Sequence, residues 1–394
     1  MVDASGIEAL VRAVGRALWR DRLAALIEAA APATHAGRAT LQRHGIELTL
    51  ERLRRGLSRP PSAAERAIAG YARMAVDTLD ALSAPGRDAL LAALRAALTG
   101  EACLACLCHL LRTASMQRAR GFEVRFAGFE DGATFDLLIS RDGMEAEIAC
   151  DTISAEDGRG VHRGAWFQLV DRIDPDLQGW LRAHPGRYLL KMTLPKGLRP
   201  REDAALLGTL HTRITQMLNE SRRADHDEAA VLRLDPLMLA AAQADELGLM
   251  PRLRKEFGPE AHLSVTAAGG GVFVMAARAG RENEVALAVR RRLAAVAPAR
   301  LTGTRPGIIA VFMEDTDRTE WRLLRERLEL EGETRQFMTN PEARSVVAVT
   351  CSSRLELFGL VGPDAAPDGE LRFRNPAHPA AKAEALAPAV QSSM

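Results

Sequence analysis

The stretch from residue 101 to residue 193 constrains the fold of this chain more than any other. It begins with apolar residues at helical spacing over about 101–120. Three short apolar segments follow at about 122–127, 134–139 and 145–151, separated by brief turns. A second helical segment covers about 160–173, and another apolar segment spans 187–193. Because loops this short join antiparallel neighbours, the three segments are predicted to form a β-meander between two helices.

The residues before this stretch read as helices alone. Apolar side chains recur at helical spacing across residues 5–119, interrupted at prolines. Ser62 is followed three positions later by Glu65, which is the spacing of a capping box that begins a helix. We therefore expect residues 1–100 to form an all-helical accessory domain.

Strands and helices alternate in the rest of the chain. Further elements are predicted at about 203–221, 229–234, 283–297, 307–313, 318–330 and 345–351, with a hairpin turn at Gly269-Gly270-Gly271. We assign residues 101–235 to a central core, residues 236–362 to a mixed α/β extension and residues 363–394, rich in Pro and Ala, to a mobile tail. The expected fold class is α+β.

The composition favours a packed, soluble protein. The chain is 47% hydrophobic and 26% charged, which suits a folded core rather than disorder. Its formal net charge of +1 gives no global attraction to nucleic acid, although residues 1–120 carry 17 arginines against 11 acidic residues. Five clustered cysteines do not suit a disulfide framework, and we find neither a signal peptide nor an apolar run of the roughly 20 residues that span a bilayer. We expect a cytoplasmic protein that does not bind membranes.

Acidic residues mark the second and third predicted strands. Asp136 begins the second strand, and Glu147 and Asp151 share one face of the third because strand side chains alternate between faces. Carboxylates from neighbouring strands provide the oxygen ligands of a hard cation such as Mg²⁺ or Mn²⁺, which could activate water against a phosphodiester. On spacing alone, a solvated strand edge explains the same residues.

The stretch from about 101 to 193 resembles the core of the PD-(D/E)XK, or restriction-endonuclease-like, nuclease superfamily. That core is an αβββαβ unit with an Asp at the start of its second strand and Glu-x-Lys on its third. More closely, the stretch resembles a bacterial branch whose third strand reads Glu-x-Glu-Cys-Lys-Thr and continues into Gly-Arg-x-x-His-Arg. The matching residues here are Glu147 to Thr152, followed by Gly158, Arg159, His162 and Arg163. The resemblance covers about a quarter of the chain.

The resemblance implies a divalent-metal-dependent endonuclease, but the chain departs from its motif at the lysine. In one alignment Ala149 replaces the metal-binding acid and Asp151 replaces the lysine. In the other register Glu147 keeps the acid and the lysine is still lost. That lysine ordinarily positions the attacking water, so its loss predicts an altered, slow or inactive site, each tenfold loss in rate being about 1.4 kcal/mol.

Two rearrangements would keep such a site active. Asp136, Glu147 and Asp151 could bind the metal as a rearranged triad. Alternatively, Lys191 on the predicted fourth strand could supply the missing ammonium group, whereas its simpler interpretation is a surface lysine on an edge strand.

Basic residues follow the third strand. Arg159, His162 and Arg163 precede or begin the next predicted helix, and arginines at a helix N-terminus attract phosphate. We predict that these three residues contact nucleic acid, with a solvated first helical turn as the alternative.

The leading functional prediction is a nucleic-acid-associated protein with a nuclease-like fold and an altered catalytic site. If active, it would hydrolyse phosphodiesters with Mg²⁺ or Mn²⁺, using Asp136, Glu147 and Lys191. The alternative is a non-enzymatic scaffold on the same fold, with a protein partner bound by the helical domain. A third reading is an unrelated α/β enzyme, whose pocket would be lined by residues outside 120–195.

Overall fold

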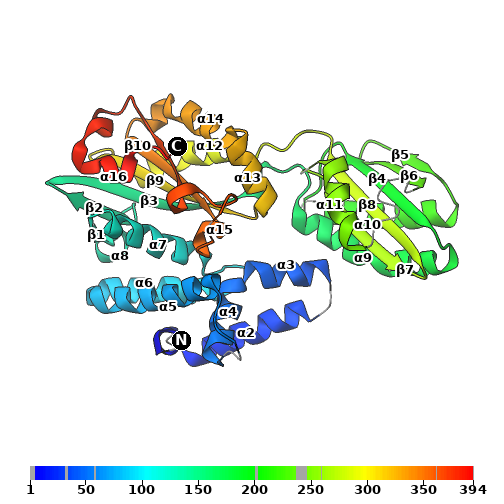
Figure 1. The fold of residues 1–394 in the computed structure, drawn as a ribbon, viewed down its shortest axis with the longest axis horizontal. Helices are drawn as coiled ribbons and strands as arrows, with labels where there is room; N and C mark the ends of the chain where they lie inside the picture. The colour runs from blue at the N-terminus through cyan, green and yellow to red at the C-terminus, as the bar shows by residue number, and fades with distance from the viewer. Residues whose placement is uncertain are drawn as a thin grey trace. The chain divides into compact units, whose positions relative to one another are not determined.

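The computed structural model describes residues 5–31, 34–56, 59–199, 203–236, 246–258, 260–360 and 362–393 (Figure 1). Contacts divide the chain into two compact units, which are described separately. Unit 1 comprises Met1–Ala29, Leu41–Ala155 and Ala286–Met394, and unit 2 comprises Ala30–Thr40 and Glu156–Val285. In the sequence, most of unit 2 is thus an insertion within unit 1.

Unit 1 begins with helices, as predicted. They are α1 (Ser5–Val14), α2 (Arg16–Ala30), α4 (Gly45–Arg54), α5 (Ala63–Ala81) and α6 (Ala84–Ala97). The capping box at the start of α5 is confirmed, because the Glu65 backbone N–H donates to Ser62 Oγ at 3.2 Å and the Ser62 N–H donates to Glu65 Oε2 at 2.7 Å. These two reciprocal bonds satisfy backbone donors that the helix itself cannot.

A six-stranded sheet forms the centre of unit 1. Its order is β1 (Glu123–Arg125), β2 (Leu137–Arg141), β3 (Met144–Ser154), β9 (Gly307–Glu314), β10 (Val346–Ser353) and β11 (Leu371–Arg374). The first three strands form the predicted antiparallel meander, β3, β9 and β10 run parallel, and β11 returns antiparallel. Every residue of β9 and β10 is buried, as expected for parallel strands covered on both faces.

Helices cover both faces of this sheet (Figure 1). On one face α7 (Ala105–Ala119) joins a shared core with Leu137, Ile139 and Ile148. On the other face lies α12 (Val285–Arg300), and α13 (Arg318–Glu326) and α14 (Glu329–Met338) connect β9 to β10. The remaining short elements are α8 (Ala127–Glu130), α15 (Arg354–Leu357), α16 (Ala387–Val390) and the 3₁₀ turns η1 (Ala155–Gly158), η3 (Pro341–Ala343), η4 (Pro367–Gly369), η5 (Pro379–Lys382) and η6 (Glu384–Leu386).

Unit 2 has a five-stranded sheet of its own. Its order is β5 (Ala224–His226), β6 (Val231–Pro236), β4 (Arg187–Leu194), β8 (Gly271–Ala279) and β7 (His262–Ala268), with only the β4–β8 pair parallel. Helices α9 (Arg163–Ala183) and α10 (Ala204–Asn219) pack against this sheet through a core that includes Trp166, Ile214 and Phe273. Helix α11 (Glu246–Phe257) packs near β7, and α3 (His35–Arg43) begins where Asp171 accepts the His35 and Ala36 N–H groups.

The β7–β8 hairpin turn is built as the glycine run predicted. Gly269 and Gly270 have φ of +56° and +77°, the left-handed region that a two-residue turn of this kind requires at both central positions. Glycine adopts that region without the strain that a Cβ introduces.

Among the described residues, no helix combines the length and apolar character needed to cross a membrane.

The predicted αβββαβ core over residues 101–235 is wrong in its second half. Strand β4 pairs with β6 and β8 in the second sheet, whereas the parallel neighbour of β3 is β9. Sequence order pointed to β4 because it is the next strand in the chain. A parallel neighbour is reached through a crossover connection, however, and here the connection contains the whole of Glu156–Val285 as well as α12.

The predicted mobile tail from residue 363 is also corrected. Strand β11 pairs with β10 from Ala348↔Arg374 to Cys351↔Leu371, and Leu386, Ala389 and Val390 are buried in the core of unit 1. The Pro- and Ala-rich composition gave no signal for a strand of only four residues or for a set of single-turn helices.

Candidate functional site

The register between β2 and β3 brings the acidic residues to one face of the sheet. Leu138 pairs with Glu147, and Leu137 pairs with Ile148. Asp136 precedes Leu137 and so lies level with Ala149. Since directly paired residues share a face and alternate residues on a strand do too, Asp136, Glu147 and Asp151 face α12 rather than α7.

Asp136 is held by one backbone group and one arginine. Its Oδ2 accepts the Cys150 N–H at 2.7 Å and Nη2 of Arg300 at 2.8 Å. The carboxylate thereby accepts a backbone N–H of β3 at a position that lies beyond the first residue of β2. Burial raises the pKa of the Asp136 carboxyl, and the attraction of Arg300 offsets only part of that effect.

Asp151 is bound by a second arginine of α12. Arg292 donates from Nε to Oδ2 at 2.5 Å and from Nη2 to Oδ1 at 2.7 Å. This two-point geometry is the strongest arrangement of an arginine with a carboxylate. Asp151 is buried, so the guanidinium supplies the charge that compensates for its removal from water.

Glu147 is completely buried and is bound by the loop that follows α12. Its carboxylate accepts the Thr302 N–H at 2.8 Å and the Thr302 hydroxyl at 2.5 Å, with Nη1 of Arg305 at 3.5 Å. Arg305 also donates from Nε to Glu145 at 2.7 Å. The carboxylates of Asp136, Glu145, Glu147 and Asp151 form the acidic face of the sheet. Each of them accepts a hydrogen bond from a donor within residues 292–305.

The predicted metal triad does not form in this arrangement. Across the described residues, no group of three or more His, Cys, Asp or Glu side chains is placed to hold a metal ion. Asp136, Glu147 and Asp151 each have a separate donor instead of a shared centre. Carboxylates engaged by guanidinium groups do not offer the free oxygen ligands that Mg²⁺ or Mn²⁺ takes, so the donor set does not fit such an ion.

Ala149 occupies the position level with Asp136. Its side chain is fully buried, and its methyl group has no oxygen to offer a cation. The register therefore places no carboxylate of β3 level with Asp136.

Lys191 belongs to a different sheet in a different unit. It lies on β4, where its Nζ is 3.3 Å from Asp235 Oδ2 of the paired strand β6. The prediction that Lys191 supplies the missing ammonium group assumed that β4 continues the sheet of Asp136. That assumption is wrong, because β9 takes the place next to β3.

The segment of Arg159, His162 and Arg163 lies in unit 2 and is packed closely. Arg159 is buried and pairs with Glu156, whose other oxygen accepts the Arg163 N–H at 2.7 Å. The His162 N–H donates to Leu198 O at 2.9 Å. Arg159 is therefore not placed to contact phosphate, whereas the nucleic-acid role of the partly exposed His162 and Arg163 stays a prediction.

Glycines explain much of the Gly-Arg-x-x-His-Arg run. A Cβ on Gly158 would lie 2.4 Å from Cα of Val285, and one on Gly160 would lie 2.5 Å from Cβ of Ala279. Both distances are far shorter than any real carbon contact, so these positions need glycine to let two backbones approach. The run thus has a packing role within unit 2.

Sequence reasoning missed the partners of the acidic face, above all Arg292 and Arg300. Their spacing of eight residues on α12 places them about two turns apart on similar faces of the helix, which was the available signal.

No family model, no curated protein and no solved structure matches this chain.

Proposed function

We propose that this chain is a nucleic-acid-associated protein with a nuclease-like core that does not cleave its ligand. The support begins with topology. If the residues of unit 2 and the four-residue helix α8 are set aside, the elements α7, β1, β2, β3, α12 and β9 follow the order helix, three strands, helix, strand, and β9 is parallel to β3. That is the order of the superfamily which the sequence around Asp136 and Glu147 resembles, although a fold by itself does not define a function.

The proposal that the chain does not cleave its ligand rests on two ion pairs, Asp136 with Arg300 and Asp151 with Arg292. A guanidinium group stays protonated and has no acceptor, so it can neither take a proton from water nor coordinate it as a metal does. Two positive charges thus stand beside carboxylates that a hydrolytic site would use for a cation. The pairs make this face a structural feature of unit 1.

The same pairs support association with nucleic acid. Acids that are neutralised by arginines no longer repel phosphate, and the side chains of Arg292 and Arg305 are each still about half exposed, at 49% and 40%. Arg291 is exposed beside Arg292 on α12. Arginines of this kind contact the phosphate backbone without reading sequence.

The test measures cleavage and binding separately. Wild type and Asp136→Ala are compared on supercoiled, linear and single-stranded DNA with Mg²⁺ and with Mn²⁺. Equal background cleavage by both proteins is expected. Metal-dependent cleavage that disappears in Asp136→Ala would overturn the proposal.

Binding is measured by fluorescence anisotropy of a labelled duplex at increasing salt. We expect affinity that falls with salt, because phosphate contacts release counterions. Arg291→Glu should weaken it, whereas Arg335→Glu on α14, another exposed arginine of unit 1, serves as the matched control. If no DNA binds even at low salt, the non-enzymatic protein scaffold becomes the better function.

A further inference from the structure

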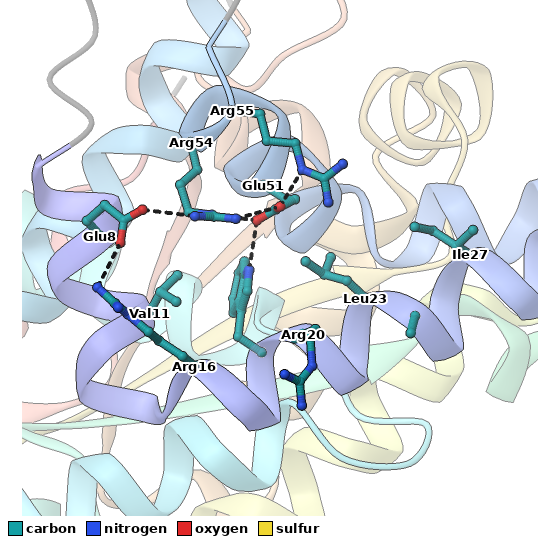
Figure 2. A pocket seen from close by; sticks show the side chains of 11 residues that line it. Glu8, Val11, Arg16, Arg20, Leu23, Ile27, Glu51, Arg54 and Arg55 are labelled. Carbon is teal, nitrogen blue, oxygen red and sulfur yellow. Dashed lines mark hydrogen bonds and ion pairs between the residues drawn. The ribbon is translucent and has the colours of Figure 1, made fainter.

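A pocket of about 580 Å³ lies in unit 1 among α1, α2 and α4 (Figure 2). It shares no residue with the acidic face of the sheet, and its volume is within the range of roughly 300–1,000 Å³ that is typical of small-molecule sites. Its lining residues lie outside 120–195, where the third reading of the sequence expected a pocket, and the proposed function assigns it no role.

One part of the pocket wall is apolar. Val11 of α1 and Trp19 and Leu23 of α2 are buried and form its floor, while Ile27, one turn beyond Leu23, is 57% exposed at the rim. A large aliphatic side chain left in water next to a buried apolar floor marks a surface that gains free energy when an apolar group covers it. The wall therefore suits the hydrocarbon part of a ligand.

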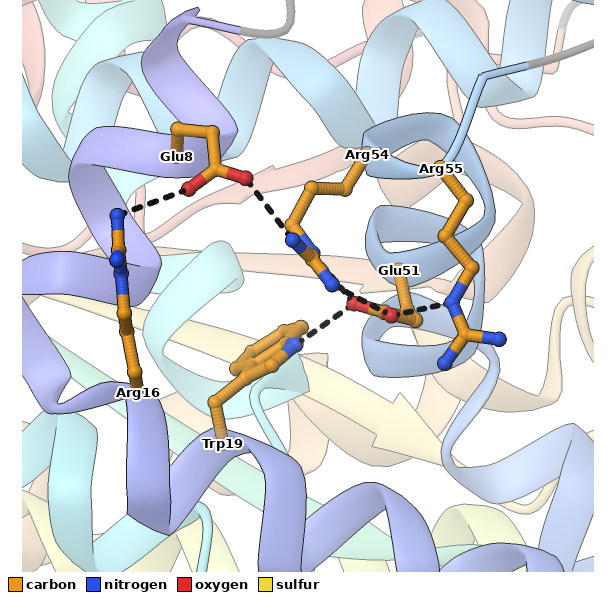
Figure 3. Close-up of polar contacts among 6 residues, drawn as sticks. All are labelled: Glu8, Arg16, Trp19, Glu51, Arg54 and Arg55. Carbon is orange, nitrogen blue, oxygen red and sulfur yellow. Dashed lines mark hydrogen bonds and ion pairs between the residues drawn. The ribbon is translucent and has the colours of Figure 1, made fainter.

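The opposite wall is a fixed polar network (Figure 3). Trp19 Nε1 donates to Glu51 Oε2 at 3.0 Å, and the same carboxylate accepts bonds from Arg54 at 2.7 and 2.9 Å and from Arg55 at 2.6 Å. The bonds from Arg54, together with those from Trp19 and Arg55, lower the pKa of Glu51 to about 2. Glu8 joins the network through Arg54 at 2.9 Å.

The network leaves an excess of positive charge around the opening. Four arginines line the pocket with two glutamates, Glu8 and Glu51, and each glutamate is shared between two arginines. Arg55 contacts Glu51 through Nε, so the outer edge of its guanidinium points away from that carboxylate (Figure 3). Arg20 pairs only with the adjacent, exposed Asp21 among the described residues, a contact that water weakens.

We propose that this pocket binds a small amphipathic anion, a carboxylate or phosphate attached to an aliphatic or aromatic body. The body would lie on Trp19, Leu23 and Ile27, and the acid group would be bound by Arg55, with the positive charge of Arg20 on the other side of these apolar side chains (Figure 2). Guanidinium groups bind both acids through paired N–H donors. Because the apolar residues lie in a pocket lined by α1, α2 and α4, we take the ligand to be a free molecule rather than a lipid held in a bilayer.

The probe for the test is 1-anilinonaphthalene-8-sulfonate, an aromatic anion whose fluorescence rises in an apolar site. Dodecanoate and dodecyl phosphate are the anionic competitors, and dodecyltrimethylammonium is the cationic control with the same chain. We expect a saturable fluorescence increase that both anions reverse and the cation does not.

The variants separate charge from apolar contact. Arg20→Glu combined with Arg55→Glu should weaken dodecanoate by at least about tenfold, the loss expected for one charge-assisted hydrogen bond or more. Ile27→Asp tests the apolar rim, and Arg12→Glu is the matched control on α1 outside the pocket. All the replaced side chains are mainly exposed, and circular dichroism checks that each variant folds.

Four outcomes would overturn the proposal. These are equal binding by wild type and the double arginine variant, equal competition by the cation, no saturable probe binding, or binding only to vesicles that contain an anionic phospholipid. Displacement of the probe by poly-glutamate but not by dodecanoate would reassign the pocket to an acidic protein segment.

Discussion

Asp151 and Arg292 form a two-point ion pair although 141 positions separate them in the sequence. Asp151 lies on the last strand of the meander, before the inserted unit, and Arg292 lies on the helix that follows that unit. The pair therefore joins the two parts of unit 1 that the insertion interrupts. It also gives the acidic face a positive charge that is independent of any metal.

The first prediction concerns the stability of this pair. Arg292→Ala should lower the free energy of unfolding by about 1.5–3 kcal/mol, since it leaves the buried Asp151 carboxylate without its charged donor. Combining Arg292→Ala with Asp151→Asn should recover part of the loss, because an amide is less costly to bury than a charge. Urea unfolding of the four proteins in a double-mutant cycle measures the coupling. Arg291→Ala, one position earlier and exposed, is the control; a loss as large as that of Arg292→Ala would show that the ion pair is not the cause.

A second prediction introduces the motif of the nuclease superfamily that residues 101–193 resemble. Ala149→Glu and Asp151→Lys would place an acid level with Asp136 and a lysine two positions on, while Arg292→Ala and Arg300→Ala remove the guanidinium groups that oppose them. We expect this fourfold variant to bind Mg²⁺ in a calorimetric titration and wild type not to do so.

The matched control for this variant is the double variant Arg292→Ala, Arg300→Ala, which exposes the acids without adding ligands. Mg²⁺ binding by wild type with similar affinity would contradict the structural role of the pairs. If the fourfold variant folds and binds no metal, the acidic face is not a decayed metal site.

Much of the local structure could be predicted from sequence because its signals are local. The periodicity around β3 and β9 and the Ser62–Glu65 capping box each depend on a few neighbouring residues. The pairing of β3 with β9 could not be predicted in the same way. Many strands of similar composition follow β3, and nothing local distinguishes the one that lies beyond the insertion.

In the candidate site, too, the local features could be predicted from sequence and the long-range contacts could not. The spacing of Glu147 and Asp151 correctly predicted a shared strand face, and Asp136 lies on that face through the register. The roles of these acids depend on the side chains that bind them, which are Arg292, Arg300 and Thr302. The resemblance gave no information on these partners. Those contacts arise from the tertiary packing of α12 on the sheet, and the resemblance ended before that helix began.

A third prediction follows from the histidine of α7. His109 is buried between its bond to the Ala310 carbonyl at 3.1 Å and Ser352, and burial lowers its pKa to about 4. In the unfolded chain its pKa returns to about 6.5, so between these values the unfolded state binds more protons. Stability should therefore be complete above pH 6.5 and fall as the pH drops toward 4, by up to about 3 kcal/mol for a shift of this size.

The measurement compares wild type with His109→Gln, which can still donate to the carbonyl. The free energy of unfolding of the variant should change less between pH 6.5 and 4. His262 in unit 2 has a pKa lowered to about 3 and contributes a slope of the same sign, so the difference between the two proteins is the relevant quantity. Parallel pH profiles would show that folding leaves the pKa of His109 unchanged.

The fourth prediction tests the packing role of the Gly-Arg-x-x-His-Arg run. Gly158→Ala forces a methyl group to within 2.4 Å of the Val285 backbone, which cannot move aside as a side chain end could. Overpacking of this kind typically costs about 1–3 kcal/mol. Gly179→Ala is the matched control, since a Cβ there meets nothing within 4 Å and α9 should gain about 0.5–1 kcal/mol from losing a helical glycine.

Hydrogen exchange followed by mass spectrometry locates the effect. Faster exchange in Gly158→Ala should appear in peptides of unit 2, because both members of the contact belong to it. Protection equal to wild type in those peptides would mean that the chain accommodates the methyl group. The run from Gly158 to Arg163 would then need another explanation, and phosphate contact by His162 and Arg163 would be the first to test.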